Sequence, residues 1–378
     1  MNLALSDEQE FLREAARGAL SRFKTVEAAR EGLEGGAQPD LWPTAVEAGW
    51  PGLLVDEEHG GAGLSVFDAM LVAEETGRFL AGVPLISHLQ ATSVLNAAGH
   101  AALAATAAGE QRAAFVPARP PGDRETSWTI DPASGLERAP LPAASVDGDT
   151  VTVDGVAHWV LDAPGADLFV VPAETADGTF VVAAIPAASV SVETVMRYDA
   201  TRSLGHVTLA GAQGTVVDAG PDAVERAWYV GQSLLAAESV GTVDTILEMA
   251  LTYAKERFTF GRTIGSYQAI KHGLVEILRL RENARSLLYW AGYAAGDVPE
   301  EFAMAASCAR TAGSKALDFA AQRNIATHGG IGATWEHDAP LYFRRAQLSR
   351  RLLGGSADAA DRVAGELIAG AAASAATA

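Results

Sequence analysis

The spacing of apolar residues changes twice along this chain, and that change limits the folds it can adopt more than any other feature. Up to about residue 118 the apolar positions recur at helical spacing, from about 124 to 217 they alternate, and from 221 the helical spacing returns. Residues 117–123 separate the first two regions, because their prolines lack the amide hydrogen that a helix needs. The sequence therefore predicts a mixed, mainly α-helical protein of three domains.

The first domain, residues 1–118, is expected to be helical. Ser6 followed by Gln9 has the spacing of a capping box and predicts a helix start. A second helix is expected over residues 66–79, after the glycine-rich break at 60–63, and a third over residues 89–98.

The second domain, residues 124–217, is expected to be a β-sandwich or barrel-like unit. Residues 150–153 alternate between polar and apolar side chains. Three Asp-Gly pairs, at 147–148, 154–155 and 177–178, are typical of hairpin turns, so antiparallel strands are predicted on either side of each.

The third domain, residues 221–368, is predicted to be an antiparallel four-helix bundle, because long apolar faces at helical spacing follow one another with short connections. Residues 369–378 are small and can bury little, so a flexible tail is expected there.

Composition excludes several classes of function. The formal net charge of −19 disfavours nucleic acid and anionic membrane surfaces as partners. No apolar run approaches the roughly 20 residues of a membrane span, so no membrane insertion is expected. Cys308 is the only cysteine and the histidines lack ligand spacing, so neither an internal disulfide nor a metal site is predicted. A cytoplasmic location fits these features.

Several segments resemble the acyl-CoA dehydrogenase family. They are Gly49–Leu54, Glu57–Leu64, Glu74–Arg78, the Arg-Phe-Thr-Phe-Gly run that begins at Arg257 and extends to Gln268, and the His-Gly-Gly-Ile-Gly turn at 328–332. The resemblance extends over roughly residues 5 to 365. Residues 199–202 and 335–338 are similar to actinobacterial members that act on CoA thioesters.

The resemblance implies an FAD cofactor and names residues for it. Arg257, Thr259, Phe260 and Gln268 lie in the family's cofactor segment, where an arginine fork suits phosphate oxygens. The adjacent glycines Gly329 and Gly330 permit close backbone approach. In the family this segment reaches the FAD of a neighbouring subunit, which implies a dimer or tetramer.

In the β domain, Thr129 lies in a degenerate version of the family's flavin-contacting loop, residues 128–135. Trp159 matches a tryptophan that packs beside the flavin ring, although it would serve equally as plain core. Leu161 stands where a threonine often hydrogen-bonds the ring.

The family removes two hydrogens across the Cα–Cβ bond of an acyl-CoA, and a glutamate at one of two positions takes the α-proton. Here those two positions are occupied by Leu353 and Gly231, which cannot accept a proton. Gln232 replaces an arginine near the CoA side, and Ala326 replaces a glutamine that contacts the cofactor.

Three other carboxylates are considered as replacement bases. Asp131 and Asp358 lie near the site by motif position. Glu238 lies about 10 Å along the same helix from Gly231, too far for the same substrate pose, and is expected to be a paired, buried carboxylate.

These departures favour the base-lacking subunit of a heteromeric acyl-CoA dehydrogenase, a type known among actinobacterial members that act on steroid side chains. The partners implied are an acyl-CoA substrate, a sister subunit that supplies the base, and an electron-transfer acceptor protein. The alternatives are a homomeric enzyme with a relocated base, a flavin monooxygenase on the same fold, and a non-catalytic binding protein.

Overall fold

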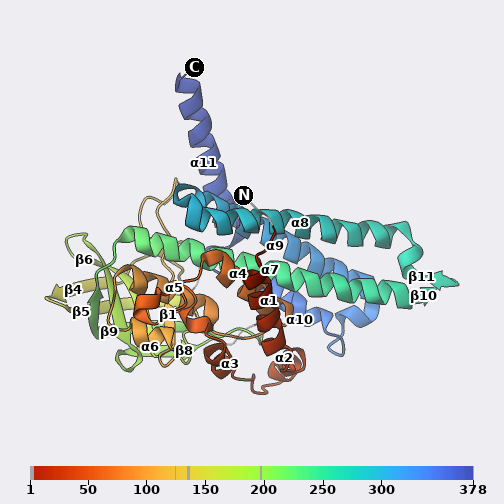
Figure 1. Cartoon of the computed structure of the whole chain (residues 1–378), viewed down its shortest axis with the longest axis horizontal. Coiled ribbons are helices and arrows are strands. Elements are labelled where there is room, and N and C mark those ends of the chain that lie inside the picture. Colours follow the sequence, from red (N-terminus) through yellow and green to blue (C-terminus); the bar gives the residue numbers. More distant parts are fainter. Residues whose placement is uncertain (1–3, 124, 134–136, 196–197, 378) are drawn as a thin grey trace.

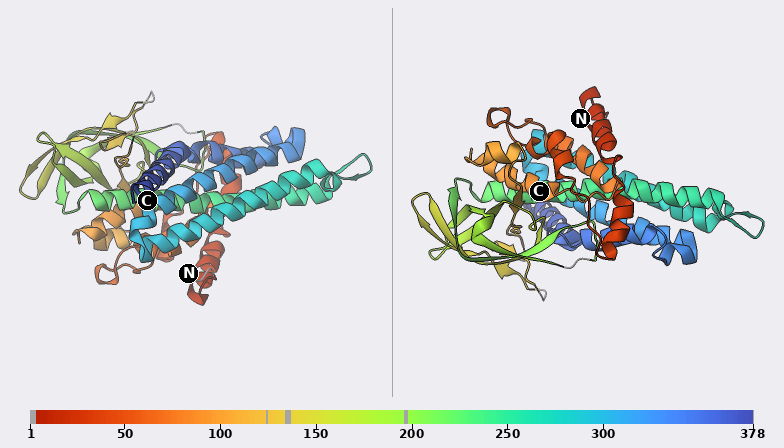
Figure 2. Two further views of the ribbon diagram at one scale, coloured as in Figure 1. Left: turned by 90° about the horizontal axis from the view of Figure 1, so that it is seen from above. Right: turned by 90° about the horizontal axis from the view of Figure 1, so that it is seen from below.

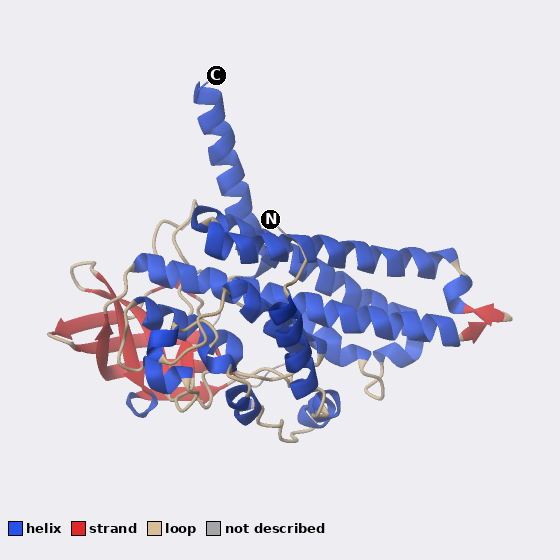
Figure 3. Ribbon diagram, viewed as in Figure 1, coloured by secondary structure: helices blue, strands red, loops and turns tan. Residues whose placement is uncertain are grey.

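A computed structural model describes residues 4–123, 125–133, 137–195 and 198–377. The molecule is elongated, with a β domain at one end, long helices along its length and a small hairpin at the other end (Figures 1 and 3). The predicted order of helices, β domain and helical bundle is confirmed.

The amino-terminal region is built from short helices. They are α1 (Asp7–Leu20), α2 (Thr25–Leu33), α3 (Trp42–Glu47), α4 (Val66–Arg78), α5 (Leu85–Ala97) and α6 (Leu103–Ala107), with 3-10 turns η1 (Trp50–Gly52) and η2 (Glu57–His59). The capping box of α1 is present, since Ser6 Oγ accepts a hydrogen bond from the Gln9 amide at 3.2 Å. Helix α5 begins four residues before the predicted start, directly after Pro84, which is well suited to a helix entry.

Helix α4 packs against α7 (Pro221–Glu256) at a very close distance, and two glycines make this possible. A Cβ atom on Gly77 would lie 2.0 Å from the carbonyl oxygen of Glu238, and one on Gly241 would lie 1.8 Å from that of Glu74. Each glycine therefore receives the backbone of the opposite helix. This contact ties the amino-terminal helices to the bundle that carries the site.

The β domain contains a closed ring of five strands. Including those outside the ring, the strands of this region are β1 (Ala113–Phe115), β2 (Thr129–Ile130), β3 (Ala139–Pro140), β4 (Ala143–Asp147), β5 (Thr150–Leu161), β6 (Leu168–Thr175), β7 (Phe180–Pro186), β8 (Val190–Thr194) and β9 (Leu204–Val217), with the 3-10 turn η3 (Ala187–Ser189) before β8. The ring runs β6-β4-β5-β9-β7 and closes through the β6–β7 pairing, while β8 pairs with β9 at its edge. Strand β1, from within the range predicted as helical, pairs in parallel with β6.

Two of the three predicted Asp-Gly turns connect strands, at 147–148 between β4 and β5 and at 177–178 between β6 and β7. The third prediction is wrong, because Asp154 and Gly155 lie inside β5. The register shifts there, between Val153 and Gly155, and Asp154 Oδ1 accepts a hydrogen bond from the Gly211 amide of β9 at 2.7 Å. The pair therefore forms a bulge, which bends a strand without ending it.

Long helices form the carboxyl-terminal bundle. They are α7, α8 (Gln268–Asp297), α9 (Phe302–His328), α10 (Ala339–Ser349) and α11 (Gly355–Thr377), with 3-10 turns η4 (Ile264–Ser266), η5 (Pro299–Glu301) and η6 (Gly329–Ala333) and the hairpin of β10 (Phe258–Thr259) and β11 (Arg262–Thr263). The end of α11 projects from the body (Figure 1). Residues 369–377, part of the segment expected to be a flexible tail, are helical here, in keeping with the high helix propensity of alanine. Among the described helices, none is both long and apolar enough to cross a bilayer.

Candidate active site

The two positions at which a base is expected lie against each other. Gly231 is on α7, and Leu353 lies in the turn that follows α10. A Cβ atom on Gly231 would lie 2.6 Å from Leu353 Cδ1 and 2.3 Å from Gln90 Nε2. Gln90 is fixed there by donating a hydrogen bond to the carbonyl oxygen of Ala227 at 3.0 Å. The space for a base is therefore filled by a leucine and an amide, neither of which takes up a proton.

The turn that carries Leu353 is stabilised by hydrogen bonds from a buried arginine. Leu353 and the two glycines after it all have positive φ angles, and that of Leu353 is 49°. Arg310 of α9 is fully buried and donates hydrogen bonds to the carbonyl oxygens of Ser349 and of Leu352, the latter at 3.1 Å. Burial lowers the pKa of Arg310 to about 10, which still leaves it protonated at neutral pH. These charge-assisted hydrogen bonds from Arg310 thus stabilise a turn in which Leu353 has a left-handed backbone conformation, one that leucine rarely adopts.

A cavity of about 440 Å³ opens beside this turn and is called the Trp159 cavity below. Its lining consists of Gln90, Phe115, Pro117, Asp131, Pro132, Ala133, Arg138, Trp159, Leu161, Leu204, Leu348, Arg351, Leu352 and Leu353. Of the residues predicted to contact a flavin ring, Trp159 and Leu161 are in this lining. Thr129 is not, and its hydroxyl donates to Glu125 Oε2 at 3.2 Å. Residues 134–136 of the expected loop lie outside the described part of the chain.

Trp159 reaches the cavity through a bulge in β5. The register between β5 and β9 shifts between Ala157 and Val160, and Trp159 has a φ of 56°. Its indole Nε1 donates to the Pro132 carbonyl oxygen at 3.1 Å. Its side chain is 38% exposed, so Trp159 is a wall of the cavity and not part of the β-domain core.

Two of the considered replacement bases, Asp131 and Asp358, share a single arginine. Arg138 forms ion pairs with Asp131 and, at 2.5 Å, with Asp358. Burial raises the pKa of Asp358, while Arg138 and Arg119 oppose that rise. Only Asp131 lines the Trp159 cavity, and both carboxylates are engaged in ion pairs. An ion-paired carboxylate is a weaker proton acceptor than a free one.

Glu238, the third considered base, is enclosed. Its side chain is buried between Arg202 and Arg345, and Arg345 Nη1 lies 2.7 Å from Glu238 Oε1. Arg345 also pairs with Asp199 at 2.7 Å, which ties the segment before β9 to α10. Glu238 is not in the lining of the Trp159 cavity. The expectation of a paired, buried carboxylate agrees with this geometry.

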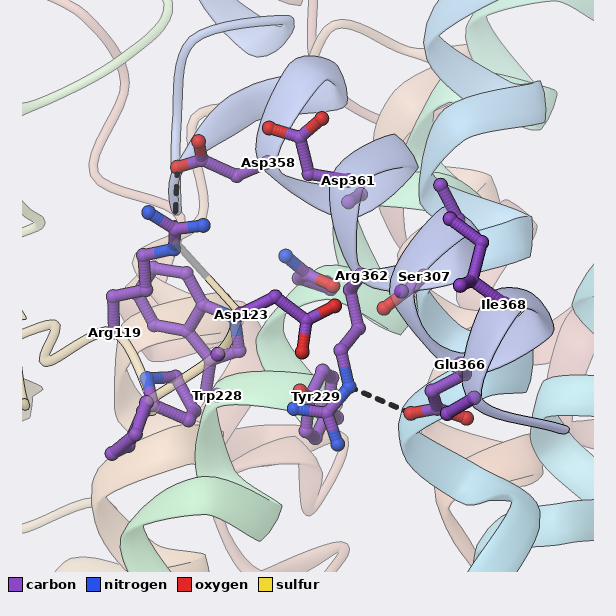
Figure 4. A pocket seen from close by; sticks show the side chains of 18 residues that line it. Arg119, Asp123, Trp228, Tyr229, Ser307, Asp358, Asp361, Arg362, Glu366 and Ile368 are labelled. Carbon is purple, nitrogen blue, oxygen red and sulfur yellow. Dashed lines mark hydrogen bonds and ion pairs between the residues drawn. The ribbon is translucent and has the colours of Figure 1, made fainter. Parts of the chain in front are cut away.

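A second cavity, of about 400 Å³, is lined in part by Gln232 and is called the Gln232 cavity (Figure 4). Its charged lining residues are Arg119, Asp123, Asp358, Asp361, Arg362 and Glu366, so four carboxylates face two arginines. Gln232 Nε2 donates to the Leu353 carbonyl oxygen at 3.3 Å, which joins the walls of the two cavities. Gln232 Oε1 and Ser307 Oγ, both buried in this lining, have no hydrogen-bond partner among the described residues.

The predicted nucleotide-binding residues lie together at the far end of the bundle. Arg257 ends α7 and is exposed, and Phe260 at the tip of the β10–β11 hairpin is 94% exposed. The hairpin is braced by Tyr267, whose hydroxyl donates to the Thr259 carbonyl oxygen at 3.1 Å. Gln268 begins α8 and is also exposed.

The glycine turn reaches the same end of the molecule. The ring of His328, which immediately precedes Gly329 and Gly330, lies 4.3 Å from the ring of Tyr253, one helical turn before Arg257. Both glycines are exposed there. The two motifs, about 70 residues apart in the sequence, therefore meet at one end of α7.

The length of α7 separates this end from the Trp159 cavity. Gly231 precedes Arg257 by 26 residues, which corresponds to about 39 Å along a helix axis. Figures 1 and 2 show the β domain and the β10–β11 hairpin at opposite ends in every view. Arg257 and Phe260 thus cannot reach the Trp159 cavity of their own chain.

Comparison with solved structures identifies the class of fold. A variant of the Tcur3481-Tcur3483 steroid ACAD superposes with a TM-score of 0.84 at 27% identity, over 97% of this chain and 99% of the matched chain. The fold is therefore that of an acyl-CoA dehydrogenase.

Sequence comparison places the chain in a family. Residues 6–119 match the acyl-CoA dehydrogenase N-terminal domain, and residues 218–367 match the acyl-CoA dehydrogenase C-terminal domain. Acyl-CoA dehydrogenase IpdE2 of Mycobacterium tuberculosis is 31% identical over 92% of this chain and 93% of its own length. FadE34 of the same organism is 32% identical over 94% of this chain, which spans 47% of that longer protein. The chain belongs to the acyl-CoA dehydrogenase family, whose members are flavoproteins and oxidoreductases that act on CH–CH groups.

Several site residues carry no signal in the motifs. Gln90 lies in the middle of α5 and enters the site only through tertiary packing. Arg138 forms one of its ion pairs with Asp358, which is far away in the sequence. Arg310 is different, because the sequence places it on the alanine-rich face of α9. A charged residue on such a face is expected to be buried and to have a hydrogen-bonding partner.

Proposed function

We propose that this chain is the base-lacking subunit of a heteromeric acyl-CoA dehydrogenase that carries out FAD-dependent α,β-dehydrogenation of an acyl-CoA thioester. One observation carries the proposal: Leu353 and Gln90 fill the space at Gly231 where a base would stand. The exposed Arg257 and Phe260 lie about 39 Å along α7 from the cavity of their own chain, so we expect them to serve a flavin on another chain. The sister chain supplies that flavin site and the base.

The residues of this chain fit the two ends of FAD at two separate places. Arg257 offers a fork of donors that suits a pyrophosphate, and the 94% exposed Phe260 offers an aromatic face beside it. Thr259, Gln268, Gly329 and Gly330 complete this nucleotide surface. Bound FAD would supply the acceptor for the hydride that leaves Cβ of the acyl group. Trp159 and Leu161 form a flat, apolar wall that suits a flavin ring, but without a base beside it.

The geometry around Gly231 disfavours a homomeric enzyme with a relocated base. Leu353 and Gln90 fill the position of the missing carboxylate. Asp131 is paired with Arg138, and Glu238 is enclosed by two arginines. No carboxylate among the described residues of the Trp159 cavity is left without a cation.

The Gln232 cavity supports the same assignment. Gln232 replaces the arginine expected near the CoA side, and the cavity beside it carries four carboxylates against two arginines. The phosphates of CoA would be repelled by this surplus of negative charge. A sister chain with a more basic cavity is therefore the better host for the substrate.

Co-expression with a base-containing sister subunit tests the proposal. The isolated chain should bind FAD poorly and show no acyl-CoA dehydrogenase activity, whereas the purified complex should be yellow and bleach when an acyl-CoA is added. Efficient turnover by the isolated chain contradicts the proposal and restores a homomeric enzyme. Oxygen consumption with reduced flavin identifies a monooxygenase, and a complex without flavin or acyl-CoA binding identifies a non-catalytic binding protein.

A further inference from the structure

Two histidines lie in contact with each other beside Trp159. His158 precedes Trp159 in β5, and His206 lies on the paired strand β9. Their Nδ1 atoms are 3.1 Å apart, and their ring centroids are 4.7 Å apart. The ring of His206 also meets the indole of Trp159 edge to face, with the centroids 4.9 Å apart. Trp159 is therefore positioned against imidazoles, the side chains that most often change charge near neutral pH.

The hydrogen bonds around His206 determine where its ring hydrogen lies. The backbone N–H of Trp159 donates to His206 Nδ1 at 3.4 Å. A backbone N–H can only donate, so His206 Nδ1 is an acceptor and carries no hydrogen. In the contact between the two rings, His158 Nδ1 then carries the hydrogen, since one donor and one acceptor are needed. Neutral His206 thus accepts hydrogen bonds from two consecutive residues of β5.

These two residues form the bulge that brings Trp159 to its cavity. The register of β5 with β9 passes directly from Ala157 to Val160, so the regular ladder is interrupted at residues 158 and 159. Trp159 has a φ of 56°, in the left-handed region that a tryptophan rarely adopts. An acceptor on β9 that binds both residues of the bulge stabilises this backbone conformation, and His206 Nδ1 is that acceptor.

The charges around the pair direct an added proton to His206. Glu193 of β8 is directly opposite His206 in the β8–β9 register, and a carboxylate there favours a positive imidazole. Burial, and repulsion by His206, lower the pKa of His158. On the side of the indole, Asp131 is ion-paired with Arg138, so the two charges largely cancel. As the pH falls, His206 is therefore the ring that gains the second hydrogen.

We propose that His206 is a positioning residue for Trp159 and makes this wall of the Trp159 cavity sensitive to pH. Neutral His206 holds the bulge through its bare Nδ1. Protonated His206 carries hydrogens on both ring nitrogens, so the Trp159 amide loses its acceptor and the indole leaves its place in the wall. The switch belongs to this chain alone, whereas its effect on a bound flavin rests on the proposed function.

Fluorine NMR of the isolated full-length chain, labelled with 5-fluorotryptophan, tests the switch. The chain has seven tryptophans, so the resonance that is missing from Trp159→Phe identifies Trp159. This resonance should shift along a single protonation curve as the pH falls from about 8 to about 5, the range in which imidazoles titrate.

Two substitutions of His206 separate its acceptor from its charge. His206→Asn keeps an acceptor oxygen near the place of Nδ1 but cannot be protonated in this range, so the Trp159 resonance should stay at its pH 8 position throughout. His206→Phe has no acceptor, so the resonance should lie away from that position at every pH.

Two further variants complete the test. Glu193→Gln removes the carboxylate opposite His206 and should lower the midpoint of the transition. His272→Asn, which removes an exposed histidine of α8, is the control and should titrate like the wild type.

A wild-type Trp159 resonance that does not move between these pH values overturns the proposal. So does a transition that persists in a His206→Asn chain with native circular dichroism. Flavin, acyl-CoA and the sister subunit are not needed for any of these measurements. Failure of the histidine switch and failure of the proposed function are therefore distinguishable.

Discussion

Gly231 is the residue on which the closed site depends. With no side chain there, Gln90 and Leu353 can both approach α7, and the amide of Gln90 can reach the Ala227 carbonyl oxygen. A glycine inside a helix normally costs about 1 kcal/mol relative to alanine, so a reason for it is expected. Here the reason is steric.

Gly231→Ala should therefore destabilise the chain, although alanine favours helices. The added methyl group would collide with Gln90 and Leu353, and overpacking of this kind costs about 1–3 kcal/mol. The midpoint of thermal unfolding should fall by several degrees. Gly18→Ala in α1, where no atom lies within 4 Å of the added carbon, is the control and should not lower the midpoint. Equal behaviour of the two variants would show that the site is not tightly packed.

Asp162 makes the stability of the chain depend on pH. It is buried behind Leu161, its Oδ2 has no hydrogen-bond partner among the described residues, and burial raises its pKa to about 7. Arg202 opposes this rise, and Glu238 adds to it. Because the unfolded carboxyl has a pKa near 4, the folded state holds the proton more strongly, and stability is lost as pH rises from about 4 to about 7.

Asp162→Asn should remove this dependence. The asparagine variant should gain stability relative to the wild type between pH 4 and pH 8, by at most about 4 kcal/mol, the free energy of a three-unit shift. Unfolding followed at both pH values measures the gain. Parallel pH profiles for the two proteins would mean that Asp162 is ionised in the folded state.

Sequence motifs located some of these residues and missed others for a physical reason. Gly231, Leu353 and Trp159 were found because each replaces or repeats a residue at a fixed distance from a motif. Gln90, Arg138 and Arg351 were not found, since their positions depend on contacts between elements far apart in the chain. Spacing along a sequence does not predict which side chain will share a cavity.

Among the elements, the β10–β11 hairpin is the one that the proposed function places against another chain. Phe260 and Gly261 both have positive φ angles, 53° and 78°, as a two-residue type I′ turn requires. Asparagine or glycine is the usual first residue of such a turn, so phenylalanine is there at a cost in local strain. A strained and 94% exposed aromatic side chain is best explained by a partner that covers it.

Phe260→Asn should separate local stability from function. Asparagine tolerates the left-handed backbone, so the thermal midpoint of the isolated chain should stay the same or rise by a degree or two. The complex should nevertheless retain less FAD, because the aromatic face is gone. FAD retention is measured as the absorbance of the purified complex near 450 nm, where flavins absorb, relative to the absorbance near 280 nm. Unchanged retention would mean that Phe260 has another role.

Helices and strands were predicted well where the apolar pattern continued over many residues. They were predicted less well at their ends and where the pattern was interrupted. The Asp154-Gly155 pair has the signature of a turn, but pairing with β9 through Asp154 Oδ1 keeps it inside β5. Residues 369–377 lack bulky apolar side chains, yet alanine propensity extends α11 to Thr377. In both places a competing interaction or propensity outweighed the pattern.

At the scale of the whole molecule, the length of α7 decides the assembly. A 36-residue helix is about 54 Å long, and it carries the closed site near its start and Arg257 at its end. Under the proposed function, one chain presents half of a nucleotide site at each of these two ends, which lie at opposite ends of the body (Figure 2). In the proposed heteromeric complex, two chains side by side would complete what neither completes alone, and only one of the two composite sites would need a base.

The most direct measurement of this arrangement is the affinity of the reconstituted heteromeric complex for FAD when only this chain carries Arg257→Ala. The loss of a charged fork to phosphate should weaken FAD binding by about ten-fold to a hundred-fold, while Arg262→Ala, an arginine of the same hairpin that stacks on Tyr267, should bind FAD like the wild type. If the Arg257→Ala complex holds FAD as tightly as the wild type, the flavin of the sister chain is not gripped from this end of α7, and the heteromeric account is wrong.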